Sequence, residues 1–327
     1  MIVNSNFRPA GGLRGPHIQT LWASQVRRPP RIQLRRDRLE LPDGDFVDLD
    51  WTEGSSAAPI VMVLHGLEGS SDSGYARGLL HAVVKKGWRG VVMHSRGCSG
   101  EPNRLRRGYC AGTTDDPSTV ALSLSRRFPG VPLVAVGYSL GGNALLNWLG
   151  ESGNRNPLSA AVAVSIPFRL ALATDRLNRG LSRLYRGYLL RSLKKSYSEK
   201  FTNRADAPYP LDRLDALWDF RAFDHYITAP LNGYDSAEHY YAAASSRSHL
   251  AGISVPTLIV QARDDPFMTP EVLPNEAELS PQVTLEISAS GGHVGFVSGS
   301  LWRPRYWLEE RIPAFIEQRL ASASYPP

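Results

Sequence analysis

Short apolar runs alternate with longer amphipathic segments along this chain, and the alternation predicts an α/β architecture. From residue 60 onward, runs of strand length are separated by helix-length segments, which favours a mostly parallel sheet with helices on both faces. Only residues 42–45, which include Pro42 and Gly44, separate the first two runs, so the sheet is expected to begin with an antiparallel hairpin. The eight predicted strands are 31–41, 46–51, 60–64, 90–94, 132–136, 160–165, 257–261 and 283–287.

The stretch 168–250 departs from this rhythm. It contains no clear strand, and its Leu, Tyr and Ala residues recur at helical spacing. A helical segment inserted between two strands is expected to form a cap over an α/β core. The predicted organisation is therefore a first part of the core at 1–167, a helical cap insertion at 168–250 and a second part of the core at 251–327, with 321–327 as a frayed tail.

Composition narrows the class of protein. Of the 327 residues, 42% are hydrophobic and 21% are charged, which is ordinary for a soluble globular protein and excludes disordered and fibrous chains. The two cysteines, Cys98 and Cys110, are too few for a disulfide framework and lack the spacing of a zinc site, so a reducing compartment is expected. The first residues do not resemble a signal peptide and no run is long enough to span a membrane, which predicts a cytoplasmic location.

The net charge of +6 raises the question of an anionic partner. Much of it lies in two segments, 27–36 and 176–195. A solvated basic surface explains them most simply, and peripheral contact with a membrane or lipid surface is the alternative. No helix-turn-helix, zinc-finger or RNA-recognition pattern supports a nucleic-acid partner.

Ser139 is the strongest candidate for chemistry. It lies between Gly137 and Gly141, after the apolar run 131–136 and before the helical run 143–149. A serine on a sharp turn from strand to helix, flanked by glycines, is typical of the nucleophile elbow of α/β-hydrolases. The glycines are needed because the turn brings strand and helix so close that a Cβ would collide. The predicted fold is accordingly an α/β-hydrolase fold with a mostly parallel eight-stranded sheet and a helical cap insertion.

A serine hydroxyl needs a base, and the base needs a group that fixes its tautomer. In this fold the acid and then the histidine follow the serine along the chain. That order favours His293, in a glycine-flanked loop after the last predicted strand. Four other histidines precede the serine and three lie in the predicted cap: His17, His65, His81 and His94, then His225, His239 and His249.

Two adjacent carboxylates compete for the role of the acid, Asp264 and Asp265, directly after the strand 257–261. Asp265 is preferred because the acid in this fold usually lies three residues after a small residue at the strand end, and Ala262 fills the small position. Asp264 is then expected to cap the turn or the following helix.

The negative charge that develops on the substrate oxygen needs two backbone donors. One is expected to be the amide of Leu140, at the start of the helix after Ser139. The other is expected to be the amide of Leu67, because Gly66 and Gly69 let the turn after residue 64 fold back towards the site. His65 is expected to brace this turn.

These residues together resemble the YheT-like branch of the α/β-hydrolases, the AB hydrolase 4 family, over nearly the whole chain. The resemblance rests on motifs at 7–9, 16–22, 65–69, 96–103, 137–143, 223–224, 228–231, 264–267 and 291–296. It implies a serine esterase or lipase-like hydrolase that acts on short- to medium-chain acyl esters, and on monoacylglycerols, with Ser139, Asp265 and His293 as the catalytic triad. The expected partner is a small-molecule acyl ester, and no metal or organic cofactor is implied.

Two alternatives remain open from the sequence. The same triad serves acyl transfer to another acceptor, or cleavage of thioesters and amides. The alternative that is not an enzyme is a binding protein that keeps the fold but catalyses no reaction.

Overall fold

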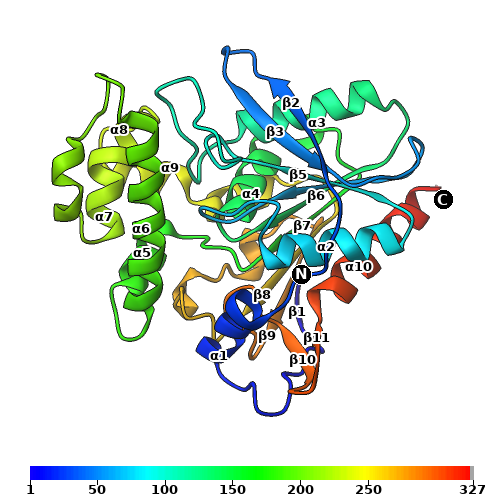
Figure 1. The fold of residues 1–327 in the computed structure, drawn as a ribbon. Coiled ribbons are helices and arrows are strands. Elements are labelled where there is room, and N and C mark those ends of the chain that lie inside the picture. Colours follow the sequence, from blue (N-terminus) through cyan, green and yellow to red (C-terminus); the bar gives the residue numbers. More distant parts are fainter. Residues whose placement is uncertain (325–327) are drawn as a thin grey trace.

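A nine-stranded sheet forms the centre of the protein in the computed structural model, which describes residues 1–324 (Figure 1). The strand order is β1-β9-β8-β7-β6-β4-β5-β3-β2. Strands β4 to β9 pair in parallel, whereas β2 pairs with β3 and β3 pairs with β5 in antiparallel fashion. The predicted strands correspond to β2 (Arg35–Glu40), β3 (Phe46–Trp51), β4 (Ile60–Leu64), β5 (Arg89–Met93), β6 (Leu133–Tyr138), β7 (Ala160–Val164), β8 (Thr257–Ala262) and β9 (Val283–Ser288).

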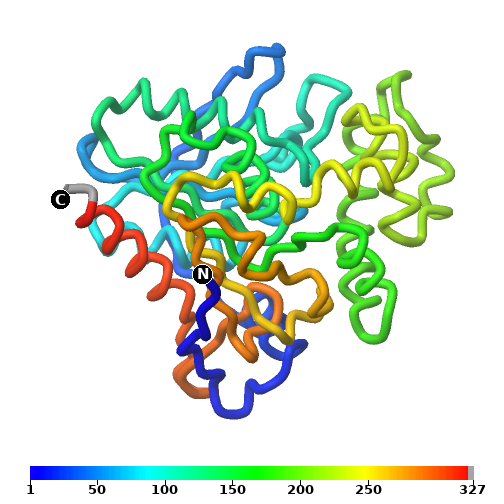
Figure 2. The backbone as a smooth tube through the Cα atoms, turned by 180° about the vertical axis from the view of Figure 1, so that it is seen from behind, coloured from blue at the N-terminus to red at the C-terminus, as the bar shows by residue number. Residues whose placement is uncertain are grey.

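The sheet has one strand more than predicted. Strand β1 (Ile2–Asn4) pairs in parallel with β9, so the first residues lie beside a strand from the last fifth of the chain at one sheet edge, as the adjoining blue and orange segments of Figure 2 show. Three residues are too few to show an alternating pattern, so the sequence does not reveal β1. A separate hairpin, β10 (Val297–Ser300) with β11 (Arg303–Tyr306), was also not predicted.

The first predicted strand is too long. The run 31–41 is expected to be extended throughout, but β2 begins at Arg35. Arg35 pairs with Trp51, the last residue of β3, so the residues before it have no ladder partner. The chain end is also more regular than expected: helix α10 (Leu308–Ser324) continues through 321–324, and the last three residues of the predicted tail, 325–327, lie outside the described residues.

Helices cover both faces of the sheet because its central strands are apolar on both sides. Along β4, Met62 and Leu64 belong to one hydrophobic core, and Val61 and Val63 to the other. Helices α3 (Asp115–Arg127) and α4 (Leu140–Ser152) close the first core. Helices α2 (Gly74–Lys85) and α10 close the second.

None of the described residues between β7 and β8 forms a strand, and the helices there lie together beyond one end of the sheet (Figure 1). Most of them share one hydrophobic cluster, which includes Leu190, Tyr197, Phe201 and Phe223, whereas the last helix of the group packs into a second cluster through Tyr240 and Tyr241. The segment comprises α5 (Leu170–Leu177), α6 (Ser182–Phe201), α7 (Phe220–Phe223), α8 (Ala229–Leu231) and α9 (Ala237–Ala244), with shorter turns at Leu211–Ala216, Asp224–Thr228 and Ser246–Gly252.

The remaining helical elements are short. Helix α1 (Pro16–Leu21) continues into a wider π-helical turn, Trp22–Val26. Single turns occur at Gly153–Arg155, Pro270–Val272 and Glu276–Glu278. Across residues 1–324, every helix is too short or too polar to traverse a lipid bilayer.

Candidate active site

Ser139 occupies the turn between β6 and α4 with strained backbone angles, φ 51° and ψ −119°. The flanking glycines permit this turn. A Cβ on Gly137 would lie 2.5 Å from the Cα of Gly142, and one on Gly141 would lie 2.2 Å from the carbonyl oxygen of His65. Both contacts are with backbone that cannot move aside, so any larger residue would displace the elbow from the strand beside it.

The structure brings the predicted base and acid to this serine. His293 Nε2 lies 2.9 Å from Ser139 Oγ, and His293 Nδ1 lies 2.8 Å from Asp265 Oδ2. A carboxylate can only accept a hydrogen bond, so Nδ1 carries the proton and Nε2 presents its lone pair to the serine hydroxyl. Asp265 is buried, and its second oxygen accepts the amide N–H of Phe267 at 2.9 Å. This arrangement can remove a proton from the serine.

Asp264 has a different position from the one predicted. It is expected to cap the turn or the next helix, but its Oδ1 accepts the amide N–H of Gly292 at 2.9 Å, in the loop that carries His293. Burial, together with the negative charge of Asp265, raises the pKa of Asp264 above its ordinary value. Asp264 therefore holds the histidine loop, whereas Asp265 contacts the imidazole.

Three further contacts fix the His293 loop, and the sequence does not predict them. The N–H of His293 donates to Thr20 Oγ1 at 2.9 Å, and the N–H of Val294 donates to Ser165 Oγ at 3.0 Å. The ring of Phe267 stacks on the imidazole, with centroids 4.0 Å apart. Thr20 lies in the 16–22 motif, so the resemblance marks its segment without assigning it a role.

Both predicted oxyanion donors lie beside the serine. Leu67 and Leu140 line the same cavity as Ser139 and His293. A Cβ on Gly66 would lie 3.3 Å from the Ser139 Cβ, so the turn that carries Leu67 packs directly against the elbow. Within residues 1–324, neither the Leu67 amide nor the Leu140 amide donates to a protein acceptor. Both N–H groups are thus free for a ligand oxygen.

His65 braces the turn, as expected. Its Nε2 accepts the amide N–H of Ser95 at 3.0 Å, so Nδ1 carries the proton and donates to the carbonyl oxygen of Gly66 at 2.7 Å. Complete burial lowers the pKa of His65 to about 4, with a further decrease caused by His94, although the bond to Gly66 opposes the shift. The imidazole is therefore neutral near pH 7, and it lies too far into the core to act as a base.

The cavity over Ser139 encloses about 790 Å³, its open mouth included. Apolar side chains line most of its wall, among them Leu177, Leu189, Leu193 and Phe220, together with Phe267 from the loop after β8. A few polar groups, including Asp224 and Thr228, complete the lining. Burial raises the pKa of Asp224 to about 6, although Thr228 and Tyr241 donate hydrogen bonds to it. A mostly apolar cavity that opens onto a nucleophile suits an acyl group.

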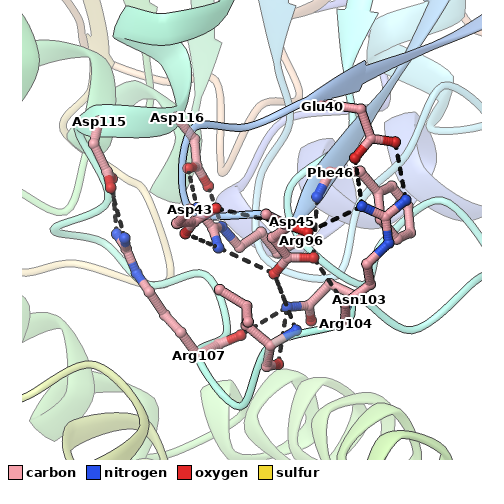
Figure 3. A network of polar contacts seen from close by, with 12 residues as sticks. Glu40, Asp43, Asp45, Phe46, Arg96, Asn103, Arg104, Arg107, Asp115 and Asp116 are labelled. Atoms are coloured by element: carbon pink, nitrogen blue, oxygen red, sulfur yellow. Dashed lines mark hydrogen bonds and ion pairs between the residues drawn. The ribbon is translucent and has the colours of Figure 1, made fainter.

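The 96–103 motif forms a buried polar network beside the cavity (Figure 3). Arg96 donates two hydrogen bonds to Asp116, at 2.7 and 2.8 Å, and pairs with Asp43 and Asp45. Asn103 donates to Asp45 and to the carbonyl oxygen of Arg107, which ties the turn between β2 and β3 to the loop that leads to α3. The motif therefore shapes the loops next to the site rather than contacting Ser139.

Comparison with known proteins identifies the family to which the chain belongs. Residues 59–300 match the family described as the alpha/beta hydrolase fold. The chain is 45% identical to "Putative esterase YheT" of Escherichia coli, over 98% of this chain and 96% of that protein. It is 31% identical to "Phospholipase ABHD3" of Mus musculus, over 97% and 79% respectively.

Among solved structures, the esterase PF2001 of Pyrococcus furiosus superposes with a TM-score of 0.58. The superposition covers 89% of this chain and 97% of the esterase chain, and the two sequences are 15% identical. At this identity the similarity shows the fold alone. The family match spans most of the chain, and the similarity to YheT extends over nearly its full length. The chain therefore belongs to the α/β-hydrolase fold family, in the branch of esterase- and lipase-type enzymes that includes YheT.

Proposed function

We propose that this protein hydrolyses carboxylic esters with Ser139 as nucleophile, His293 as general base and acid, and Asp265 as the group that orients the imidazole. The observation that carries the proposal is the continuous line of hydrogen bonds from Asp265 through His293 to Ser139, at 2.8 and 2.9 Å. The serine at its end lies in the wall of an apolar cavity. These are the parts that acyl transfer through a serine requires.

The reaction follows from these positions. Ser139 Oγ attacks the ester carbonyl carbon while its proton moves to His293 Nε2, and the carbonyl oxygen becomes an oxyanion that accepts the N–H groups of Leu67 and Leu140. Collapse of this intermediate breaks the bond to the alcohol, which leaves with the proton from His293. Water then attacks the acyl-enzyme with the same base, and the acid product departs from a regenerated Ser139.

The apolar wall of the cavity favours short- to medium-chain acyl groups, including those of monoacylglycerols. Leu177 in α5, with Leu189 and Leu193 in α6, contributes to that wall, which supports the assignment of 168–250 as a cap over a core formed by 1–167 and 251–327. Chain-length selectivity would then depend on how these helices pack above Ser139.

Labelling with a fluorophosphonate, followed by peptide mass spectrometry, tests the proposal. The adduct is expected on Ser139, and Ser139→Ala should abolish both the adduct and the turnover of p-nitrophenyl esters while the far-UV spectrum stays unchanged. Product analysis with added short alcohols separates hydrolysis from acyl transfer. A folded protein that turns over no ester and takes up no label would favour a role as a binding protein.

A second part of the proposal concerns peripheral contact with lipid. At the N-terminal end of α6, Leu184 and Tyr188 are 72% and 58% exposed, and Leu181 beside them is 62% exposed. Trp218, 63% exposed, lies close to the same helix, because Arg186 Cζ is 5.3 Å from the centroid of its ring. Residues 176–200 contain eight basic residues and one acidic residue. Exposed apolar side chains among basic ones suit an anionic lipid surface.

Co-sedimentation with vesicles tests this contact. Binding is expected to vesicles that contain phosphatidylglycerol and to be weaker for pure phosphatidylcholine, because two of the nearby cations, Arg183 and Arg191, pair with no carboxylate among residues 1–324. Leu184→Ser should weaken binding, and Leu122→Ser, which changes an exposed leucine on α3, serves as the matched control. Equal binding by both variants would remove this part of the proposal. The cytoplasmic location stays a prediction, which the two free cysteines support.

A further inference from the structure

Glu68 follows Leu67 directly and takes part in three buried or half-buried hydrogen bonds. Its amide N–H donates to the hydroxyl oxygen of Tyr109 at 2.8 Å, and that hydroxyl donates back to Glu68 Oε1 at 2.9 Å. The second carboxylate oxygen accepts the hydroxyl of Ser196 at 2.5 Å. Glu68 adopts a left-handed φ of 53°, which is unfavourable for a side chain of this kind. The reciprocal pair with Tyr109 holds this strained residue in place.

The peptide group between Gly66 and Leu67, which carries the Leu67 N–H, is fixed through its carbonyl oxygen. The carbonyl oxygen of Gly66 accepts hydrogen bonds from His65 Nδ1 at 2.7 Å and from the amide N–H of Gly69 at 3.0 Å. In a trans peptide the N–H points opposite to the C=O of the same plane, so these bonds set the direction of the Leu67 N–H. The hydrogen bonds between Glu68 and Tyr109 fix the backbone on the C-terminal side of Leu67. The N–H of Leu67 is therefore aimed by bonds on both sides of it.

Ser196 brings a distant element into this arrangement. It lies on α6, 128 residues further along the chain than Glu68, and its hydroxyl is the α6 group that bonds to the Glu68 carboxylate. The side chain of Leu67 also packs against the hydrophobic cluster that α6 shares with its neighbouring helices. The turn that carries the Leu67 amide is thus attached to α6 through two consecutive residues, one polar and one apolar.

We propose that Glu68 is a positioning residue, which couples the placement of α6 to the alignment of the Leu67 amide with the substrate oxyanion. The inference rests on the proposed ester hydrolysis and names the device that completes its oxyanion site. When Ser196 bonds to Glu68, the turn is held and the amide is aligned. Movement of α6 away from the core would release the carboxylate and let the amide turn away from the serine. The oxyanion site is complete only when the helix is docked.

Three variants test the coupling: Ser196→Ala, Glu68→Ala and the double variant. Loss of one oxyanion donor lowers kcat by about 10²–10³-fold in related chemistry, so a misaligned donor is expected to lower kcat by about tenfold in Ser196→Ala and by more in Glu68→Ala. KM for a p-nitrophenyl ester should change by less than about twofold, because the amide acts on the transition state. The double variant should be no slower than Glu68→Ala, because Ser196 acts through Glu68.

A tetrahedral adduct supplies a readout that simple loosening of the fold would not change. A trifluoromethyl ketone forms such an adduct with an active serine and places its oxyanion where the Leu67 amide is expected. Its inhibition constant should weaken by the same factor as kcat/KM in Ser196→Ala. If kcat falls while the affinity for the ketone stays unchanged, the coupling is wrong.

Lys200→Met is the matched control. Lys200 lies one helical turn after Ser196 on α6 and joins the core through Asn103 Oδ1 and the carbonyl oxygen of Arg107, at 2.7 and 2.8 Å, without contacting the turn at 66–69. The control removes an anchor of the same helix but not the contact with Glu68. Lys200→Met should therefore leave the ratio of ketone affinity to KM unchanged. If Lys200→Met and Ser196→Ala lose ketone affinity equally, the effect comes from docking of α6 in general, and the specific role of Glu68 is wrong.

Measurements on the wild-type protein distinguish a failure of the proposed hydrolysis from a failure of the proposed role of Glu68. If it turns over no ester and forms no ketone adduct, the proposed hydrolysis fails. If the wild type is active and Ser196→Ala matches it in kcat and in ketone affinity, only the role of Glu68 fails. Should Glu68→Ala not fold, the comparison between Ser196→Ala and Lys200→Met still decides the question.

Discussion

Phe267 lies flat against the imidazole of His293, with ring centroids 4.0 Å apart and planes only 5° apart. The amide of the same residue donates to Asp265 Oδ1. Phe267 therefore restrains the Asp265 carboxylate through its backbone and the His293 imidazole through its side chain. The ring of Phe267 also contacts Tyr185 of α6, with centroids 5.0 Å apart.

Replacement of this ring should reduce turnover. Phe267→Leu keeps the backbone bond to Asp265 but removes the flat surface that holds the imidazole, so kcat is expected to fall by about 10–100-fold. Phe220→Leu changes another aromatic residue of the cavity wall that makes no ring contact with His293, and should alter KM more than kcat. Steady-state kinetics on one ester decide the point, and equal effects of both variants on kcat would contradict it.

The two adjacent aspartates should differ sharply when each is changed to asparagine. Asp265→Asn removes the carboxylate that fixes the His293 tautomer, and kcat is expected to fall by about 10⁴-fold, as in other serine triads. Asp264→Asn retains an oxygen that can accept the Gly292 N–H, so a loss of less than about tenfold is expected. Activity measurements on both variants, with circular dichroism to verify folding, provide the check. The reverse order would identify Asp264 as the acid.

Acid should destabilise the protein through His65. The pKa of this histidine is about 4 in the folded state and about 6.5 when solvated, so the unfolded chain binds the proton first as the pH falls. The neutral His65 imidazole contributes to the free energy of unfolding in full above about pH 6.5. This contribution, up to about 3 kcal/mol, is lost as the pH falls to about 4.

Urea titrations between pH 7 and pH 4 measure this effect. His65→Gln cannot titrate and should show a shallower dependence of unfolding free energy on pH than the wild type. Parallel curves for the two proteins would mean that the pKa of His65 is the same in the folded and unfolded states, which would contradict the prediction.

Two helical glycines should respond in opposite directions to alanine. A Cβ on Gly141 would lie 2.2 Å from a backbone oxygen of His65, so Gly141→Ala is expected to lower the free energy of unfolding by at least about 2 kcal/mol and to abolish activity. Gly187, within α6, has no atom within 4 Å of such a Cβ, and Gly187→Ala should raise stability by about 0.5–1 kcal/mol. Thermal denaturation distinguishes the two, and a stable, active Gly141→Ala would refute the packing argument.

Local signals in the sequence predict most of the sheet and the positions of the three triad candidates. Val61 and Val63 alternate with Met62 and Leu64 because the strand is buried on both sides, and burial of that kind leaves a visible apolar run. Gly137 and Gly141 are required by contacts within a few residues of Ser139 or in the neighbouring turn, so the elbow also leaves a local pattern. His293 follows from chain order and from its glycine-rich loop.

Contacts between distant segments leave no comparable pattern. The sequence does not distinguish Thr20 from other threonines in helices. Its role depends on the amide N–H of His293, 273 residues away, which donates to its hydroxyl oxygen. The contact between Glu68 and Ser196 also joins distant residues, 128 apart, and the position of Asp264 depends on how the loop at 292 approaches β8. The sequence could therefore rank the two adjacent carboxylates without deciding between them, because the partner that distinguishes them lies in another loop.

The pairing of β1 with β9 also sets the order in which the protein can be assembled during synthesis. Strand β1 is translated before the other strands of the sheet, and its partner, Val283–Ser288, follows about 280 residues later, which at about 5–20 residues per second takes roughly 15–60 s. The elbow at Ser139 can form well before then, but His293 and its support from Thr20 cannot. A nascent chain therefore carries the Ser139 elbow without its histidine partner until residue 293 has been translated.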